Sequence, residues 1–166
     1  MDISSFNPNI STIATVRDAW NDLFEIVSRA NLFLSKVDGV NYTIEGIKEQ
    51  QIGEARFLRA LAYFDLVRYY GRVPQTISEA MSTPQSEAVE IYEKVIIPDL
   101  EYAVGSLTEE PKDYLGRKSA SGRATLTAAK ALLGRVYLTM AGFPLYDETK
   151  KELARELLEE VIDYAD

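Results

Sequence analysis

Two residue types that carry much of protein chemistry are absent from this chain of 166 residues: it contains no cysteine and no histidine. Without cysteine there is no disulfide framework, no thiolate zinc site and no cysteine nucleophile. Without histidine the chain lacks the commonest metal ligand, the usual general base near neutral pH and every Ser-His arrangement. The composition therefore argues against the commonest catalytic and metal centres.

Basic charge and long apolar runs are also scarce. The formal net charge is -8, and because phosphate binding requires a clustered basic surface, we expect no nucleic-acid partner. No run approaches the roughly eighteen apolar residues that span a bilayer, so we expect no transmembrane segment. The opening "MDISSFNPNIS" has neither the basic start nor the apolar stretch of a signal peptide, and residues 1–11 are predicted to be irregular.

The apolar share of 46% and the charged share of 27% are those of an ordinary globular protein. At this length we expect one domain, covering residues 1–166. Helical spacing of apolar residues recurs in five blocks, near 12–37, 44–70, 86–107, 125–141 and 148–165. Pro98 predicts a bend rather than two separate helices, and Asp147 is the predicted N-cap of the last block. Sustained strand alternation is missing, so the predicted fold class is all-α.

The second block contains "EARFLRALAYFDLVRYYGRVP", residues 54–74, which is apolar on most sides. On a helical wheel, one flank holds Phe57, Ala60, Phe64 and Val67, and the other holds Leu58, Ala62, Leu66 and Tyr69. Two apolar flanks predict two packed neighbours. Arg56 and Arg59 lie between the flanks and are interpreted as ion-pairing or carbonyl-capping residues. Gly71 and Pro74 predict a firm end to the helix.

Aromatic residues are the side chains by which a sugar-binding site would be recognised in a sequence, because ring faces stack on sugar C–H surfaces as on other apolar groups. Those at helical spacing, namely Trp20, Tyr63, Phe64, Tyr92 and Tyr137, are predicted to be core residues. Tyr114, Phe143 and Tyr146 fall in predicted loops and are the candidate ligand-binding residues.

Candidates for catalysis and ion binding are weak. The acidic neighbours Glu159 and Glu160, or Asp99 and Glu101, point in different directions on a helix and do not form a hydrolase pair. "DETKKE" and "TEEPKDY" lack the spacing of a calcium loop, and "GRKSASGR" at 116–123 lacks the order of a phosphate loop. We interpret the latter as a basic loop whose Arg117, Lys118 and Arg123 can contact an acidic partner. Neither a cofactor nor a catalytic residue is expected.

The last two blocks contain a more specific pattern. Leu133-Gly134-x-x-Tyr137, followed by Ala154 and Leu158, resembles the helical hairpin of tetratricopeptide repeats. Gly134 is predicted to lie where the paired helices are closest. The five blocks are therefore expected to form antiparallel hairpins of an α-α superhelix.

The segment "GEARFLRALAYFDLVRYYGRVP" closely resembles the signature helix of the SusD/RagB family. The same order of motifs continues with "AWNDLFEIVSRANLFL" upstream and "EIYEKVIIPDLEYAV", "GRATLTAAKALLGRVYLTMAGFPLYD" and "EEVIDYA" downstream. Five motifs in one order cover nearly the whole chain. On this resemblance Arg56, Phe57, Leu58, Arg59, Ala60, Gly71 and Pro74 are structural residues of the family signature.

The resemblance implies an α-helical, cell-surface glycan- or nutrient-binding lipoprotein, held on the outer membrane by a lipid on an N-terminal cysteine. It also implies a partner, a SusC-type TonB-dependent transporter, and an oligosaccharide ligand contacted mainly outside the helical repeats. Family members run to several hundred residues, so we expect this chain to be an excised or truncated scaffold without the anchor and the main glycan contacts. The alternatives are a free-standing tetratricopeptide-like adaptor that binds peptides and, less favoured, an enzyme that acts on glycans.

Overall fold

The computed structural model describes residues 14–76, 84–119 and 122–165; the segment 1–11, predicted to be irregular, lies outside them. Its elements are α1 (Ala14–Lys36), the 3-10 turn η2 (Val37–Gly39), α2 (Ile47–Tyr70), β1 (Val73–Pro74), β2 (Gln85–Ser86), α3 (Ala88–Ile91), the π-helical turn η3 (Tyr92–Ile96), α4 (Ile97–Ser106), α5 (Leu126–Ala141) and α6 (Lys150–Ala165). The prediction of an all-α fold is confirmed. Within the described residues the only sheet is the antiparallel pair β1–β2, with Val73 opposite Ser86.

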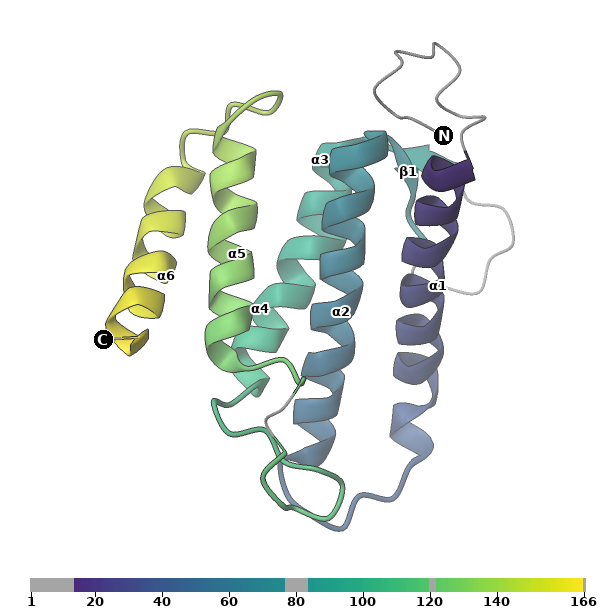
Figure 1. Ribbon diagram of the computed structural model, residues 1–166, viewed down its shortest axis with the longest axis vertical. Coiled ribbons are helices and arrows are strands. Elements are labelled where there is room, and N and C mark those ends of the chain that lie inside the picture. Colours follow the sequence, from purple (N-terminus) through teal and green to yellow (C-terminus); the bar gives the residue numbers. More distant parts are fainter. Residues whose placement is uncertain (1–13, 77–83, 120–121, 166) are drawn as a thin grey trace.

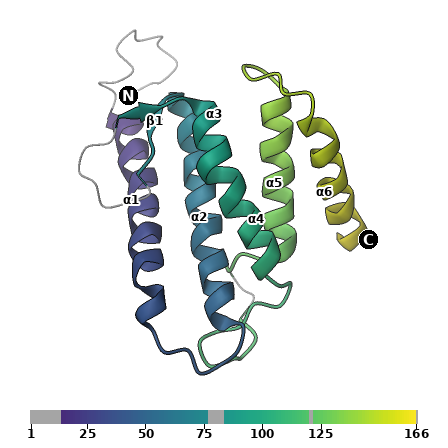
Figure 2. The same cartoon turned by 180° about the vertical axis from the view of Figure 1, so that it is seen from behind.

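The helices form successive hairpins. Figure 1 shows α1 beside α2 and α5 beside α6, with α1 and α6 at opposite edges of the molecule, and Figure 2 shows α4 on the other face. The packed pairs include α1 with α2, α2 with α4, α4 with α5, and α5 with α6. This is the stacked arrangement of antiparallel hairpins that the sequence predicts. None of the helices in the described ranges is long and apolar enough to cross a bilayer.

The core lies between α2, the α3–α4 segment and α5. Its fully buried large side chains include Tyr63, Phe64, Leu66, Ile91, Ile96, Leu100, Val136 and Met140. Four of the five predicted core aromatics are buried, and the fifth, Trp20, is partly buried against the rings of Phe24 and Tyr70 at centroid distances of 4.7 and 4.9 Å.

The prediction of two buried flanks on α2 is wrong in part. Leu58 is 50% exposed and Tyr69 is 66% exposed, whereas Arg59 and Tyr63, assigned to a polar stripe between the flanks, are buried. A helical wheel shows which positions are apolar, but the neighbouring helices decide which positions are covered. The two predicted neighbours are present, since α2 packs against α1 and against α4 with η3, but together they cover one broad face of α2 that includes Arg59.

Pro98 lies at the start of α4, directly after the π-helical turn, and it has no N–H to donate to a carbonyl of that preceding turn. The backbone remains helical from Ala88 to Ser106, and the irregularity comes one turn earlier, in η3. There the N–H of Ile97 donates to the carbonyl of Tyr92, five residues back. The segment therefore absorbs the proline with a widened turn and does not divide into separate helices.

The α5–α6 hairpin is close-packed at Gly134. A Cβ atom added to this glycine would lie 2.8 Å from Cγ of Leu158, so the prediction that the helices are closest here is supported by the packing. Asp147 accepts a hydrogen bond from the amide of Thr149 at 3.2 Å. It therefore stabilises the turn that leads into α6, which begins at Lys150, slightly later than the predicted start.

Candidate functional site

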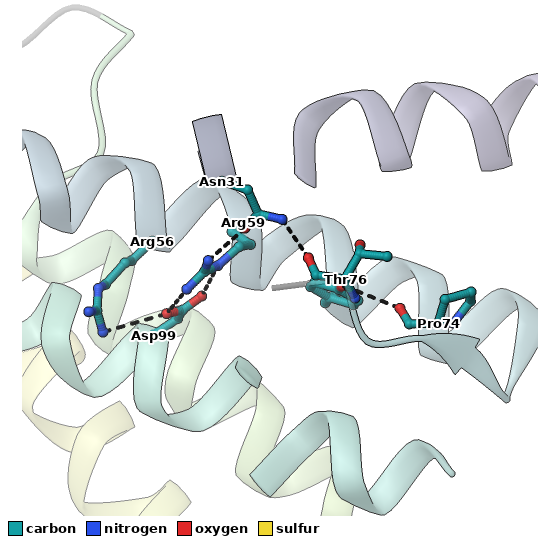
Figure 3. A network of polar contacts seen from close by, with 7 residues as sticks. Asn31, Arg56, Arg59, Pro74, Thr76 and Asp99 are labelled. Atoms are coloured by element: carbon teal, nitrogen blue, oxygen red, sulfur yellow. Dashed lines mark hydrogen bonds and ion pairs between the residues drawn. The ribbon is translucent and has the colours of Figure 1, made fainter. Parts of the chain in front are cut away.

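A buried ion pair between Arg59 of α2 and Asp99 of α4 is the central polar feature of the structure. Arg59 Nε donates to Asp99 Oδ2 at 2.7 Å and Nη2 donates to Oδ1 at 2.8 Å, with side chains only 9% and 3% exposed. The remaining nitrogen, Nη1, donates to Oδ1 of Asn31 on α1 at 2.7 Å. One guanidinium therefore joins three helices, as Figure 3 shows, through the planar two-point geometry that favours arginine over lysine.

The network extends to the chain that follows β1. Asn31 Nδ2 donates to the carbonyl of Thr76, and the amide of Thr76 donates to the hydroxyl of Tyr63 at 2.9 Å. The same hydroxyl donates to the carbonyl of Pro74 at 3.3 Å. Burial raises the pKa of Tyr63, so the hydroxyl stays protonated and able to donate. The exit from α2 is thereby tied to the core (Figure 3).

Arg56, one turn before Arg59, stacks over the ring of Tyr102 with its Cζ atom 4.3 Å from the ring centroid. Its Nη1 lies 3.7 Å from Oδ1 of Asp99. The Nε atom is buried and has no hydrogen-bond partner among the described residues. Two arginines thus approach one carboxylate, and the second is held mainly by its aromatic neighbour.

The other signature residues also serve the helix packing. Ala60 is fully buried, and Phe57 is partly buried between the main core and a smaller cluster of Ala103, Leu107 and Ala129. Leu58 instead lines an open groove of about 530 Å³ between α1 and α2. Gly71 ends α2 with a φ of 71°, a value that few residues other than glycine adopt readily.

Tyr114 lies on the loop between α4 and α5. It is 71% exposed, beside Leu115 at 52%. The loop tip is ordered by Asp113, whose carboxylate accepts hydrogen bonds from the amides of Leu115 and Arg117, each at 2.9 Å. These backbone N–H groups, with the Arg117 guanidinium, lower the pKa of Asp113. The loop therefore presents the tyrosine ring on a fixed turn.

Phe143 and Tyr146 lie on the α5–α6 turn, at the opposite end of the helices from the α4–α5 loop (Figure 1). Their ring centroids are 6.0 Å apart, with the planes inclined by 80°. The structure therefore brings two of the three candidate aromatics together and leaves Tyr114 apart. A single ligand contacting all three is excluded unless it spans the length of the helices.

The candidate carboxylates do not form a catalytic pair. Asp99 is occupied by Arg59, and Glu101 accepts a hydrogen bond from the Tyr137 hydroxyl at 3.2 Å. Burial, together with the Glu101 charge, raises the pKa of Tyr137 to about 12. Glu159 binds Arg155, and Glu160 binds Lys130. In the described residues no cluster of three or more acidic side chains could hold a metal ion.

Sequence reasoning missed a polar clamp between α2 and the α4–α5 loop. The Gln50 amide donates to the carbonyl of Lys112 at 2.8 Å and accepts from its N–H at 2.9 Å, as a neighbouring strand would. Glu54 receives two hydrogen bonds from Arg123, at 2.9 and 2.7 Å. These partners are 62 and 69 residues apart in sequence, and no spacing pattern signals them.

The cations of the predicted basic loop pair within the chain: Arg117 with Asp113, Lys118 with Glu110, and Arg123 with Glu54. Exposed pairs of this kind are weak, so the first two can exchange partners readily. Arg123 is more buried and belongs to the clamp.

The sequence model of a SusD-like protein family, described as "Starch-binding associating with outer membrane", matches residues 3–138 of this chain. A SusD-like protein of Bacteroides ovatus is 33% identical over 155 residues, which are 87% of this chain and 27% of that protein. The crystal structure of a SusD superfamily protein from Parabacteroides distasonis superposes with a TM-score of 0.79 at 32% identity, over 92% of this chain and 32% of that one. A laminarin-binding SusD-like protein gives a TM-score of 0.71 at 31% identity, over 87% and 29% of the two chains.

The chain thus spans about a third or less of the length of these relatives.

Proposed function

The chain belongs to the SusD-like family, and on that premise we propose that it is the helical scaffold of a cell-surface glycan- or nutrient-binding lipoprotein that docks on a SusC-type TonB-dependent transporter. The observation that carries the proposal is the single family match across residues 3–138, which takes in α1 to α4 and most of α5. The family is described as starch-binding and associated with the outer membrane. A lipid anchor and an outer-membrane, cell-surface location are parts of the same proposal.

The physical character of the chain supports docking over chemistry. The most buried ionic groups, Arg59 and Asp99, saturate one another and join helices, so they stabilise a shape and are not available to a reactant. The exposed surface combines apolar positions such as Leu58 with a net charge of -8. We infer a binding role without catalysis, in which a rigid frame positions the glycan contacts of the longer protein over the transporter.

The test uses the longest gene product that contains this chain, together with the purified SusC-type transporter. We expect the gene product to capture the transporter and to bind laminarin, the glycan named for one relative. A variant that lacks residues 14–165 is expected to lose the transporter. Glycan binding retained by this variant shows that the remainder has folded. Undiminished transporter capture by the folded deletion variant would refute the docking role.

The non-catalytic part is tested separately by incubating the gene product with laminarin, starch and xyloglucan. We expect the chain-length distribution of each polysaccharide to stay unchanged. Shortening of any of them would refute a purely binding role. Its loss in the Glu159→Gln/Glu160→Gln double variant would assign it to these residues, and its persistence there would point to another catalytic pair.

A further inference from the structure

A hollow of about 350 Å³ lies between the end of α2, the α3–η3 segment, the last turn of α5 and the α5–α6 turn. The residues that line it are Val67, Arg68, Gly71, Ala88, Tyr92, Thr139, Phe143, Pro144 and Leu145. We call it the Phe143 hollow. Its volume is at the lower end of the range of small-ligand sites, which is enough for a short oligosaccharide segment.

One wall of the Phe143 hollow is aromatic and unusually exposed. Phe143 is 78% exposed, although burying its ring would be favourable. Tyr146 is not one of the lining residues, but its ring lies next to that of Phe143 and is 63% exposed. Tyr146 has a φ of 51°, a left-handed conformation that costs roughly 1 kcal/mol or more in a residue with a side chain. Its amide is held by the carbonyl of Gly142 at 2.8 Å. The turn therefore fixes two perpendicular rings outward.

Another part of the lining is polar and consists of Tyr92 and Arg68. Tyr92 is only 5% exposed, and its hydroxyl makes no hydrogen bond to another described residue. The hydroxyl is not sealed from solvent, because Arg56 Nε is the one fully buried side-chain nitrogen or oxygen without a partner in the described part of the chain. Burial raises the pKa of Tyr92, and the nearby Arg68 charge opposes that rise. Arg68 itself is balanced by Asp65. The hollow thus offers a neutral donor and acceptor beside a charge that is already compensated.

We propose that the Phe143 hollow binds a neutral oligosaccharide, with one sugar ring stacked on Phe143 or Tyr146 and its hydroxyls bonded to Tyr92 and Arg68. A sugar combines an apolar C–H face with a rim of hydroxyls, which matches the aromatic wall and the unpaired Tyr92 hydroxyl. An anion gains little from Arg68, because Asp65 already neutralises it. A flat protein surface would cover the rings but leave the recessed hydroxyl unpaired.

This inference rests on the proposed glycan-binding function and adds a contact site within the helical scaffold itself. The test is NMR of this chain with assigned ring signals, titrated with laminari-, cello-, malto- and manno-oligosaccharides at millimolar concentration. We expect at least one sugar to shift the signals of Phe143, Tyr146 and Tyr92. The ring of Tyr114, equally exposed at the far end, provides the internal control and is expected not to move.

The variants sharpen the test. Phe143→Ala combined with Tyr146→Ala should weaken binding about tenfold or more, since each aromatic contact contributes about 0.5–1.5 kcal/mol. Tyr92→Phe removes only the hydroxyl and should weaken binding several-fold, while Tyr114→Ala should bind like the parent. The dispersion of the core methyl signals verifies that each variant is folded.

The site is refuted if none of the four sugars shifts the ring signals, or if the shift of the Tyr92 signal persists unchanged in the double variant. Broadening of the ring signals with protein concentration in the absence of sugar would identify a contact between copies instead, and would also overturn the proposal. If the longer gene product captures the transporter and binds laminarin but no ring signal shifts, only the Phe143 hollow is refuted as a sugar site. If the ring signals shift but the transporter is not captured, only the docking role is refuted.

Discussion

Replacing Asp99 by asparagine removes the negative charge that pairs with the buried Arg59 guanidinium. Asparagine has nearly the same volume, so the change tests charge and leaves packing almost intact. Arg59 would retain its hydrogen bond to Asn31, but Nε and Nη2 would face a neutral amide whose NH₂ group cannot accept.

The expected loss follows from burial. Breaking a buried ion pair by removing one partner destabilises a protein by about 3–5 kcal/mol, because the other charge remains desolvated. Arg59 and Asp99 are 9% and 3% exposed, which places them in this class. Because asparagine still offers one acceptor, we expect about 3 kcal/mol. At this chain length that loss lowers the melting temperature by about 6–12 °C.

The measurement is urea unfolding followed by circular dichroism, with the slope of free energy against urea expected to be unchanged. Glu25→Gln is the matched control, because it breaks an exposed pair with Arg29 and should change stability by less than about 1 kcal/mol. The combined replacement Arg59→Met and Asp99→Leu should be less harmful than Asp99→Asn alone, since it leaves no unpaired charge in this pair. A loss for Asp99→Asn no larger than for Glu25→Gln would refute the reasoning.

Three further changes test other parts of the structure. Gly134→Ala should destabilise the chain by about 1–3 kcal/mol in the same urea assay, because the added methyl group meets α6; equal stability would show that the hairpin can separate freely. The pKa of Tyr137 is raised to about 12 from an unfolded value near 10, so stability present at pH 10 should fall as the pH rises to 12, and Tyr137→Phe should flatten that decline in alkaline melting curves. If the slope is the same in both proteins, the burial of this hydroxyl next to Glu101 has been overestimated. Gln50→Leu should remove about 1–3 kcal/mol and increase hydrogen exchange at the Lys112 amide, whereas retained protection there would mean that the loop is held by other contacts.

The helices could be predicted from the sequence because their signals are local. The end of α2 at Tyr70 follows from Gly71 and Pro74, and the periodicity of the other blocks locates each helix to within a few residues. The two-residue strands β1 and β2 were missed, since an alternating pattern needs more positions than they contain.

The exposure of Leu58 and the burial of Tyr63 could not be predicted, because they depend on which side of α2 the other helices occupy. The ion pair expected for Arg59 is present, but its partner Asp99 is 40 residues away and was considered only as a weak catalytic candidate. Spacing along the chain reveals a helix face; it does not reveal which distant side chain meets that face.

The candidate aromatics show the same limit. Sequence placed Tyr114, Phe143 and Tyr146 in loops and made all three equal candidates for sugar contact. Only the fold shows that two are adjacent and one is remote, and only the fold places the free Tyr92 hydroxyl close to Phe143. Tyr92 belongs to the predicted core by its helical spacing, so its hydroxyl carried no signal of its own.

The clamp that Gln50 and Glu54 form on the α4–α5 loop makes this part of the molecule a natural place for insertions. The loop is hydrogen-bonded to α2 near both of its ends, at Lys112 and at Arg123. The tip around Tyr114 is exposed and does not contribute to the core. Residues inserted at the tip would lengthen the α4–α5 loop without displacing the helices that it connects. A reporter peptide or a foreign recognition loop could therefore be grafted there. Related chains could acquire α4–α5 loops of different length and sequence on the same helical scaffold.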